Sequence, residues 1–409
     1  MPLKGDYFQS GEVVGGFELG HWEVMVGNKA IAYAAKLARV QFISAFPITP
    51  QTTVVEYLAD MVANGELDAE YVACEGELTC QTAALGASAA GARAFTATSG
   101  PGLLYMHHPM HATSGGRFPV VMAVVHRSVK GMQPDHSDMM SQRDTSWMMF
   151  ECANAQELLD TGIMAFKIAE DPRVRLPAIF AGDGYILSYT AEPVEIPDQE
   201  DVDAFLPPYK STYPLLPELA EESRRHQLSM WGFGQDPQLR WKLQQEAMEA
   251  AKTVIREVNE EYRKRFGRGY GNGLVEEYEC DDVEAVILAM GTIASTARTA
   301  IDQLQSEGKR IGLVRLKSFK PFPSEEIVRL GKNVEAIGVI DRNISCGNGG
   351  IVFEAVRSSL YDLEEKPKTL EFYAGLVGKE VTVKDIKKIA EKTLRAARGE
   401  KLDSIIEWI

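Results

Sequence analysis

The sequence predicts an α/β protein with a doubly wound parallel sheet followed by a smaller α/β unit. Short apolar segments without polar alternation, such as 119–125, recur between stretches with helical patterns, which is typical of parallel sheets covered on both faces. A proline-rich and acidic stretch at 191–234 interrupts this alternation once. Because the chain has 409 residues, more than a single core usually spans, two or three domains are expected.

Composition and charge restrict the class of protein. The chain is 45% hydrophobic and 25% charged, and its 58 acidic against 43 basic residues give a net charge of −15. Such a balance favours solubility and argues against nucleic-acid binding, which needs a basic face. No apolar run reaches the roughly 18 residues of a membrane span. Residues 1–16 lack a basic-then-apolar signal pattern, so a cytoplasmic location is predicted.

The cysteines do not form a cluster-binding or zinc-binding pattern. None of the five belongs to a C-x-x-C pair, and buried reduced thiols are the expectation. The sequence therefore predicts that this chain holds no iron–sulfur cluster of its own. The five are Cys74, Cys80, Cys152, Cys280 and Cys346.

The first unit opens with an arm and a short helix. Residues 1–20 are rich in glycine and show no clear period, so an extended arm is expected. Asn28 can cap a helix at 29–39, whose alanines suit close packing.

A rigid turn follows the first short strand, which is expected at 41–46. Pro47 and Pro50 exclude a helix there, and Pro50 suits the first position of the next helix at 51–63. Thr49 is then expected at the N-cap of that helix, where its hydroxyl can cap the helix or meet a ligand.

The rest of the first unit alternates between strands and helices. The helix at 78–90 consists mostly of small residues, which predicts that another backbone passes close to it. A glycine turn at 99–102 leads into a further helix, and a helix at 155–170 separates the last two strands. The remaining strands are expected at 70–74, 92–98, 119–125, 148–153 and 176–181.

A connector and a long helix precede the second unit. The stretch 191–234 shows little period and predicts a long wrapping connector. A helix with an apolar stripe starts at Pro237 and ends in a glycine-rich break at 266–271. A boundary is expected within 267–279. The second unit then has strands at 283–289, 310–316, 336–340 and 371–374, each followed by a helix, the last at 383–397.

Candidate site residues gather at the carboxyl ends of the predicted strands. Thr49 lies in the first turn, Glu77 starts a helix, the segment 98–102 is a glycine-rich loop, and Arg127 follows a buried strand. In an open α/β sheet, ligands bind at this edge. The sequence therefore predicts one site formed by these segments.

These residues belong to a set of motifs that occur in the same order in a known family. The chain resembles the α subunits of the 2-oxoacid:ferredoxin oxidoreductases, the thiamine-dependent enzymes typified by pyruvate:ferredoxin oxidoreductase. The resemblance covers nearly the whole chain. It rests on Gly27-Asn28, Phe46-Pro47-Ile48-Thr49-Pro50, Glu77, Ala97-Thr98-Ser99-Gly100, Asp135-His136-Ser137-Asp138, Arg143-Asp144, Trp147, Gln156-Glu157, Phe266-Gly267-Arg268 and Tyr270-Gly271.

The resemblance implies a domain plan and a set of partners. It implies an arm at 1–20, a pyrimidine-binding domain of thiamine-enzyme type at 21–190, the connector and long helix at 191–266, and a transketolase C-terminal-like domain at 267–409. A β subunit would bind the diphosphate half of thiamine diphosphate, with Mg²⁺ and an iron–sulfur cluster. The γ and ferredoxin-like δ subunits, and in some complexes an NAD-linked subunit, would complete a dimer of heteromers.

The resemblance also implies roles for individual residues. Glu77 matches the acid that hydrogen-bonds the cofactor's pyrimidine N1′ and drives removal of the C2 proton; the alternative is a first-turn glutamate that only steadies the helix dipole. Arg127 and Thr49 match the substrate-binding arginine and threonine, and an arginine fork suits a carboxylate. The cofactor is expected to contact Pro47, Ile48, Glu77, Ser99 and Gly100.

The substrate is less well defined by the sequence. The family oxidatively decarboxylates a 2-oxoacid, transfers the acyl group to coenzyme A and passes electrons to iron–sulfur clusters. Only seven residues separate Arg127 from Asp135, fewer than pyruvate-type relatives usually have, and Met132, Met139, Met140, Met148 and Met149 crowd this region. Methionine fills irregular apolar space, so the cluster indicates either core filling or a pocket for a larger substrate such as phenylglyoxylate.

Other interpretations stay open at this stage. Pyruvate or another small 2-oxoacid is the alternative substrate, and a non-oxidative transketolase-like or dehydrogenase E1-like component is the alternative enzyme. The segment 135–138 could offer carboxylates and an imidazole to a metal, but a hydrogen-bonded turn near the pocket or at a subunit contact is the expectation, and no metal ligand is assigned.

Overall fold

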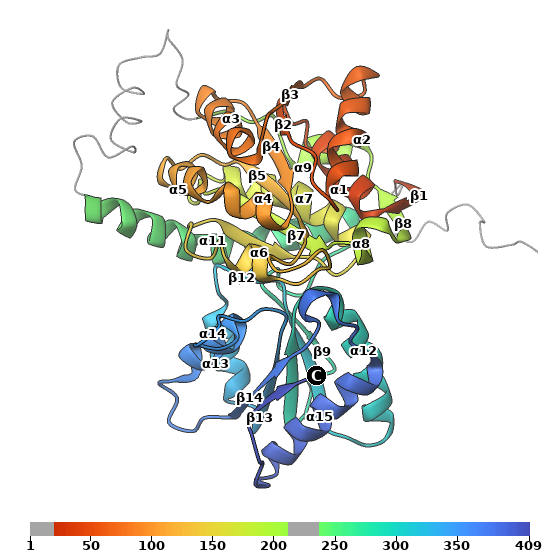
Figure 1. The fold of residues 1–409 in the computed structure, drawn as a ribbon, viewed down its shortest axis with the longest axis vertical. Helices are drawn as coiled ribbons and strands as arrows, with labels where there is room; N and C mark the ends of the chain where they lie inside the picture. The colour runs from red at the N-terminus through yellow and green to blue at the C-terminus, as the bar shows by residue number, and fades with distance from the viewer. Residues whose placement is uncertain (1–19, 212–236) are drawn as a thin grey trace, which may run out of the picture.

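The computed structural model describes residues 20–211 and 237–409, and these form two α/β units that lie one above the other in Figure 1. The first unit contains a seven-stranded sheet with the order β12-β6-β7-β5-β4-β2-β3. The second contains a six-stranded sheet with the order β15-β14-β13-β10-β11-β9. The predicted α/β class with two sheets is therefore what the chain forms.

Six strands of the first sheet run parallel to one another. They are β2 (Phe42–Ala45), β3 (Glu70–Ala73), β4 (Ala94–Thr98), β5 (Val121–His126), β6 (Met148–Glu151) and β7 (Ala178–Asp183). The seventh, β12 (Ser318–Lys320), comes from the second half of the chain and pairs antiparallel with β6. Strand β12 was not predicted from the sequence. It links the two units, because a segment of the second half of the chain completes the sheet of the first unit.

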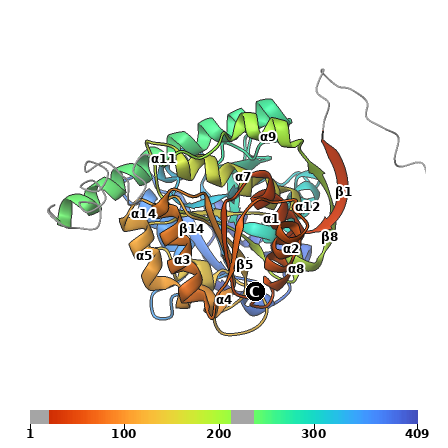
Figure 2. The ribbon, with the colours of Figure 1, turned by 90° about the horizontal axis from the view of Figure 1, so that it is seen from above.

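Helices cover both faces of the first sheet, as Figure 2 shows from above. Along β5, Val121, Ala123 and Val125 belong to one hydrophobic core, and Met122 and Val124 to the other. The alternation follows from the two-residue period of a strand. The helices are α1 (Gly27–Leu37), α2 (Thr52–Ala63), α3 (Glu77–Ala90), α4 (Gly100–Tyr105), α5 (His107–Gly115), α6 (Ser137–Met140), α7 (Ala155–Glu170) and α8 (Ile186–Tyr189).

Two predicted helix caps are wrong. Helix α1 begins at Gly27, and the Asn28 side chain instead donates to Pro50 O and to Thr53 Oγ1, each at 2.8 Å. The N-cap of α2 is Gln51. The Asn28 side chain binds the backbone carbonyl of Pro50 in the proline turn, and the helix begins after this turn. Thr49 is therefore an exposed turn residue and not a cap.

The segment predicted as an irregular connector is partly regular. Strand β8 (Ala191–Ile196) pairs antiparallel with β1 (His21–Val26) to form a two-stranded ribbon, and α9 (Gln199–Phe205) follows. Helix α11 (Pro237–Phe266) has 30 residues and packs against α7. The central part of the predicted connector and nearly all of the predicted arm lie outside the described residues.

The second unit is a parallel sheet with one antiparallel strand, β9 (Val275–Tyr278), at its edge. Its other strands are β10 (Ala285–Ala289), β11 (Ile311–Leu316), β13 (Ala336–Asp341), β14 (Lys368–Tyr373) and β15 (Ile406–Trp408). Its helices are α12 (Gly291–Ser306), α13 (Ser324–Gly331), α14 (Ile351–Leu360) and α15 (Val383–Ala397), with a short 3₁₀ turn η1 (Leu376–Gly378). Within 20–211 and 237–409, no helix has both the length and the apolar character that a membrane crossing requires.

Candidate functional site

The glycine loop, which is Ser99 after β4 together with the first residues of α4 as far as Gly102, brings two of the predicted site residues to one place. Gly100 has a φ of +46°, and a Cβ on it would lie 3.1 Å from Arg127 Cβ and Cγ. A Cβ on Gly102 would lie 2.5 Å from Glu77 Oε1 and 2.7 Å from Thr98 Oγ1. The loop therefore contacts Arg127 at one glycine and Glu77 at the other, and neither position has room for a side chain.

Glu77 is the first residue of α3 and is buried, with 9% of its surface exposed. Its carboxylate lies at the positive end of the helix dipole, where negative charge is favoured. Two hydroxyl oxygens of the adjoining segment, Thr98 Oγ1 and Ser99 Oγ, are buried and have no hydrogen-bond partner among the described residues. Buried polar atoms usually have partners, so this part of the site is prepared for a polar ligand.

Thr49 and Arg127 also lie together. The Arg127 Nη1 group donates to Thr49 O at 3.2 Å, and Nε faces Gly131 O at 3.5 Å. Pro47 and Ile48 belong to the same turn, in which the Ile48 N–H faces the Gln51 side chain at 3.4 Å. The structure thus joins Thr49 to Arg127, whereas Pro47 is exposed and Ile48 half-buried in the same turn.

Asp138 lies between the glycine loop and Arg127. It is fully buried, and its Oδ2 accepts hydrogen bonds from the backbone N–H groups of Gly100 at 3.1 Å and Arg127 at 3.0 Å. Asp135, in the same motif, accepts from Ser137 N at 3.0 Å, which confirms the predicted hydrogen-bonded turn. Asp138 was not predicted as a site residue, because nothing in the local sequence shows which amides its carboxylate contacts.

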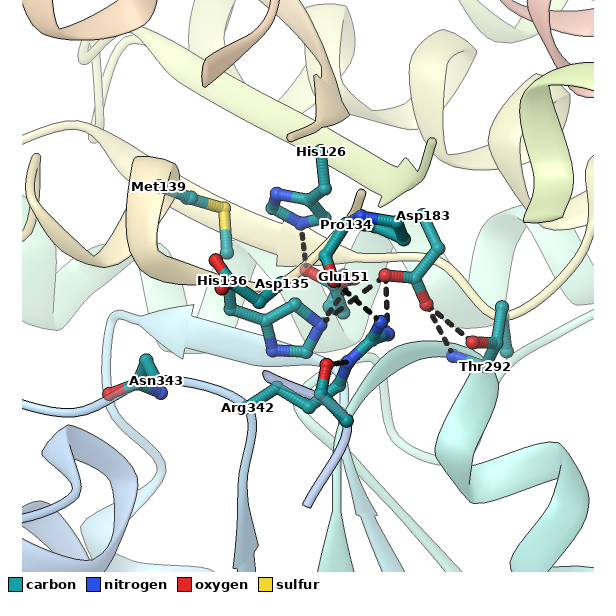
Figure 3. A network of polar contacts seen from close by, with 12 residues as sticks. His126, Pro134, Asp135, His136, Met139, Glu151, Asp183, Thr292, Arg342 and Asn343 are labelled. Carbon is teal, nitrogen blue, oxygen red and sulfur yellow. Dashed lines mark hydrogen bonds and ion pairs between the residues drawn. The ribbon is translucent and has the colours of Figure 1, made fainter. Parts of the chain in front are cut away.

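A buried polar network connects this site to the second unit (Figure 3). His126 donates from Nδ1 to Asp138 Oδ1 at 2.7 Å and from Nε2 to Glu151 Oε2 at 3.0 Å. His136 Nε2 lies 3.5 Å from Glu151 Oε1, and Arg342 Nη1 forms an ion pair with Asp183 at 2.5 Å. His126, Glu151 and Asp183 end three neighbouring strands, and polar residues closing apolar strands were the signal that could have revealed the network.

The charges in this network depend on one another. Burial raises the pKa of Glu151 to about 7, although His126 opposes the shift. Burial disfavours charge on His126, but Glu151 and Asp138 raise its pKa well above the ordinary value. Burial and the charges of His126 and Arg342 lower the pKa of His136. Both ring nitrogens of His126 face carboxylates, which is the arrangement of an imidazolium ion pair.

The methionines are placed in the core. Met139, Met140, Met148 and Met149 are fully buried in the two cores that line the first sheet, and Met132 is exposed on the loop after Arg127. Of the two interpretations of the methionine cluster, core filling describes these four.

Two family models match the chain over most of its length. The model described as pyruvate flavodoxin/ferredoxin oxidoreductase, thiamine diphosphate-binding, matches residues 33–263. The model described as pyruvate:ferredoxin oxidoreductase core domain II matches residues 283–386. The first of these alone spans more than half of the chain.

Named relatives match more than nine tenths of the chain. Ketoisovalerate oxidoreductase subunit VorA of Pyrococcus horikoshii is 40% identical over 392 residues, which cover 94% of this chain and 97% of the relative. Pyruvate synthase subunit PorA of the same organism is 42% identical over 392 residues, with the same coverage. Pyruvate synthase subunit PorA of Methanocaldococcus jannaschii is 42% identical over 378 residues, covering 91% of this chain and 95% of the relative.

Solved structures share the fold at low sequence identity. The 2-oxoglutarate:ferredoxin oxidoreductase of Magnetococcus marinus has a TM-score of 0.66 and 18% identity, covering 96% of this chain and 68% of that one. A split-gene transketolase has a TM-score of 0.53 and 13% identity, covering 92% of this chain and 100% of that one. With the family models and the relatives, the chain belongs to the 2-oxoacid:ferredoxin oxidoreductase family, as an α subunit.

Proposed function

We propose that this chain supplies one half of a thiamine diphosphate site and the carboxylate-binding residues of a coenzyme A-acylating 2-oxoacid oxidoreductase. The observation that carries the proposal is the glycine loop, which has the Glu77 carboxylate against Gly102 and the Arg127 side chain against Gly100. The acid suits the cationic cofactor and the arginine suits the anionic substrate. Their positions on one loop would bring the cofactor and the substrate together there.

The residues around the loop fit the aminopyrimidine end of the cofactor. Thr98 Oγ1 and Ser99 Oγ lack partners among the described residues, and Gly102, which has no side chain, lets the backbone lie directly against the Glu77 carboxylate. When bound, thiamine diphosphate supplies the carbon nucleophile that attacks the 2-oxo group. The diphosphate and Mg²⁺ are assigned to a partner subunit, as the resemblance to the family implies.

Glu77 would hold a proton between its carboxylate and the pyrimidine nitrogen. A buried carboxylate at a helix start can share such a proton without losing it to bulk water. Arg127 would pair with the substrate carboxylate, and the Thr49 hydroxyl would donate to it from the exposed turn. Because the Thr49 carbonyl already accepts from Arg127, the two residues would approach the substrate as one unit. Pro47 and Ile48 would close the edge of the cofactor site.

An aliphatic 2-oxoacid is the first candidate for the substrate. The named relatives are a ketoisovalerate oxidoreductase subunit and pyruvate synthase subunits. Four of the methionines that suggested a larger pocket are core residues, so they do not favour phenylglyoxylate. An aromatic substrate stays a prediction that the assay below tests.

The iron–sulfur clusters are assigned to partner subunits. The five cysteines are spread over both units, with Cys152 and Cys80 buried and only Cys346 exposed, so they do not offer four thiolates to one cluster. A β subunit, a γ subunit and a ferredoxin-like δ subunit would carry the electrons to ferredoxin or, through a further subunit, to NAD. A cytoplasmic location is part of the same proposal.

The test is a purified complex assayed with a panel of 2-oxoacids. The tagged chain is purified anaerobically with its co-purifying subunits, and reduction of a viologen dye is followed with coenzyme A and pyruvate, ketoisovalerate, 2-oxoglutarate or phenylglyoxylate. We expect a brown complex, dye reduction that requires coenzyme A, and highest kcat/KM for pyruvate or ketoisovalerate. A colourless assembly that transfers acyl groups without reducing the dye would overturn the oxidoreductase proposal in favour of a transketolase-like component.

A further inference from the structure

We propose that Asp138 is a positioning residue that fixes Arg127 against the Gly100 loop, and that a buried chain of side chains makes this alignment depend on the second α/β unit. The proposal rests on the function proposed above, in which Arg127 binds the substrate carboxylate. In this proposal, the contact between the two units helps to hold Arg127 in position.

The Asp138 carboxylate is saturated with donors. Oδ2 accepts from the N–H groups of Gly100 and Arg127, and Oδ1 accepts from Met139 N–H and from His126 Nδ1, both at 2.7 Å. The side chain is fully buried, so water cannot replace a lost bond. An ionised carboxylate offers about four acceptor sites, and all four are used here.

This arrangement requires a carboxylate. An asparagine at position 138 has one acceptor oxygen, and its amide N–H₂ group would face donors. Gly100 and Arg127 are also in direct contact, since a Cβ on Gly100 would lie 3.1 Å from the Arg127 side chain. A shift of either amide by a few tenths of an ångström therefore changes how the guanidinium lies against the loop.

The link to the second unit runs through His126 and Glu151. His126 Nε2 bonds Glu151 Oε2 at 3.0 Å, and Glu151 Oε1 is where Gly291, the first residue of α12, approaches. Gly291 has a φ of +59°, and a Cβ on it would lie 2.9 Å from Glu151 Oε1. Because Glu151 is fully buried and bonded to His126, it has little freedom to move away.

A second contact holds α12 and the following loops in place on this network. Asp183 accepts from Thr292 Oγ1 at 2.5 Å and pairs with Arg342, whose Nη2 donates to Pro134 O at 3.2 Å. Pro134 directly precedes the segment that carries Asp138 (Figure 3). The second unit is thus attached on both sides of the His126–Asp138 bond, and a displacement of α12 acts on that bond.

The first experiment uses Asp138→Asn in the intact complex. We expect KM for the 2-oxoacid to rise about tenfold or more with a smaller change in kcat, because the carboxylate of the substrate meets a misplaced guanidinium. In an Arg127→Ala background the same change should add little to KM, because Asp138 acts through Arg127. An additive effect on KM would overturn the proposal.

A readout without turnover accompanies the kinetics. Hydrogen–deuterium exchange of the substrate-free complex should show faster exchange at the amides of Gly100 and Arg127 in Asp138→Asn, because both amides donate to this carboxylate. Unchanged exchange at both amides would contradict the proposed clamp, by which we mean the hydrogen bonds from Gly100 N–H and Arg127 N–H to Asp138. This holds whether or not the proposed substrate is correct. If the wild-type complex oxidises no 2-oxoacid, the proposed function fails, and the exchange result still decides the clamp.

The second experiment compares two glycines that both have a positive φ. Gly291→Ala places a methyl group against Glu151, whereas Gly308→Ala has a φ of +78° and nothing within 4 Å of the new Cβ. Both substitutions carry the cost of a left-handed alanine, so their difference reports the contact with Glu151 at 2.9 Å and the looser contacts with Asp183 and His136 of the same network at 3.3 and 3.4 Å. We expect only Gly291→Ala to raise KM and to speed exchange at Arg127. Equal KM and equal exchange rates in the two variants would show that the substrate site does not depend on this contact with the second unit, and would overturn that part of the proposal.

Discussion

The Glu77 carboxylate occupies the space in which a side chain at Gly102 would stand. The Cβ of an alanine at Gly102 would lie 2.5 Å from Glu77 Oε1 and 2.9 Å from Glu77 Cδ. The first turn of α3 and the loop after β4 therefore fit together only with glycine at this position. The acid and the loop must be considered as one structural element.

The first prediction is that Gly102→Ala inactivates the complex without unfolding it. The new methyl group must displace Glu77 or Thr98, and overpacking of this kind costs about 1–3 kcal/mol. We expect kcat/KM to fall at least about tenfold and the affinity for thiamine diphosphate to fall with it. The control is Gly86→Ala in α3, the helix that Glu77 begins. The new Cβ there has nothing within 4 Å, and the substitution should be neutral or slightly stabilising.

The second prediction concerns the charge at position 77. Glu77→Gln keeps the size of the side chain and removes the acid, so turnover should fall by about 10²–10⁴ while the partner subunits still co-purify. Glu75→Gln is the matched control, because Glu75 is exposed and accepts from Thr79 Oγ1 at 2.6 Å. Equal losses in both variants would indicate that the helix start, and not the acid at 77, matters.

The sequence predicted those elements whose signals are local. Helices α7 and α15 have the predicted bounds, 155–170 and 383–397. Asn154 caps α7 by accepting from Glu157 N, and Thr382 and Asp385 form a capping box for α15. The start of each helix is therefore determined by residues that are neighbours in the sequence. Thr49, Glu77 and Arg127 were selected by the same kind of local signal, and their roles in the site stay predictions.

The missed features depend on residues far apart in the chain. Strand β12 pairs with β6, and β1 pairs with β8, across more than a hundred residues of sequence, and no local pattern selects such partners. The network of His126, Glu151 and Arg342 is assembled from separate strand ends of two units. Its members looked like single polar residues until the fold brought them together.

The third prediction is a pH dependence in the second unit. Burial raises the pKa of Asp341 to about 7, the N–H groups of Phe353 and Val352 oppose the shift, and the charge of Glu371 adds to it. The folded chain therefore keeps a proton that the unfolded chain releases near pH 4. The free energy of unfolding should fall as pH rises from about 4 to about 7, by at most about 4 kcal/mol from this group, and level off above that.

Glu371→Gln tests this assignment. Its side-chain oxygen can still accept from Gly350 N, as Glu371 Oε1 does at 2.5 Å, but the like charge beside Asp341 is gone. Urea unfolding of the isolated chain between pH 4.5 and 8.5 should give a shallower slope for the variant than for wild type. Parallel curves for the two proteins would show that Asp341 and Glu371 do not share the effect.

The fourth prediction concerns the ion pair that joins α7 to β11. Glu157 is fully buried and accepts from Arg315 Nη1 at 2.7 Å and from Lys317 Nζ at 2.5 Å. Burial opposes its charge, but Arg315 and Lys317 lower its pKa to about 2. Its contribution to stability is therefore complete above about pH 4.5 and is lost as pH falls towards 2.

Glu157→Gln should destabilise the chain by about 3–5 kcal/mol at pH 7, because the buried Lys317 loses its ion pair with Glu157 and Arg315 keeps only the one with Glu276. The loss should shrink in unfolding curves recorded towards pH 3, where the wild-type carboxylate begins to take up a proton. The control is Glu284→Gln, which breaks the exposed pair with Arg398 and should cost less than about 1 kcal/mol. Since Glu157 has no bond to the Asp138 network, KM for the 2-oxoacid should change little in either variant. A rise in KM for Glu157→Gln as large as for Gly291→Ala would mean that any loosening of the two units disturbs the site, and that the path through Glu151 is not special.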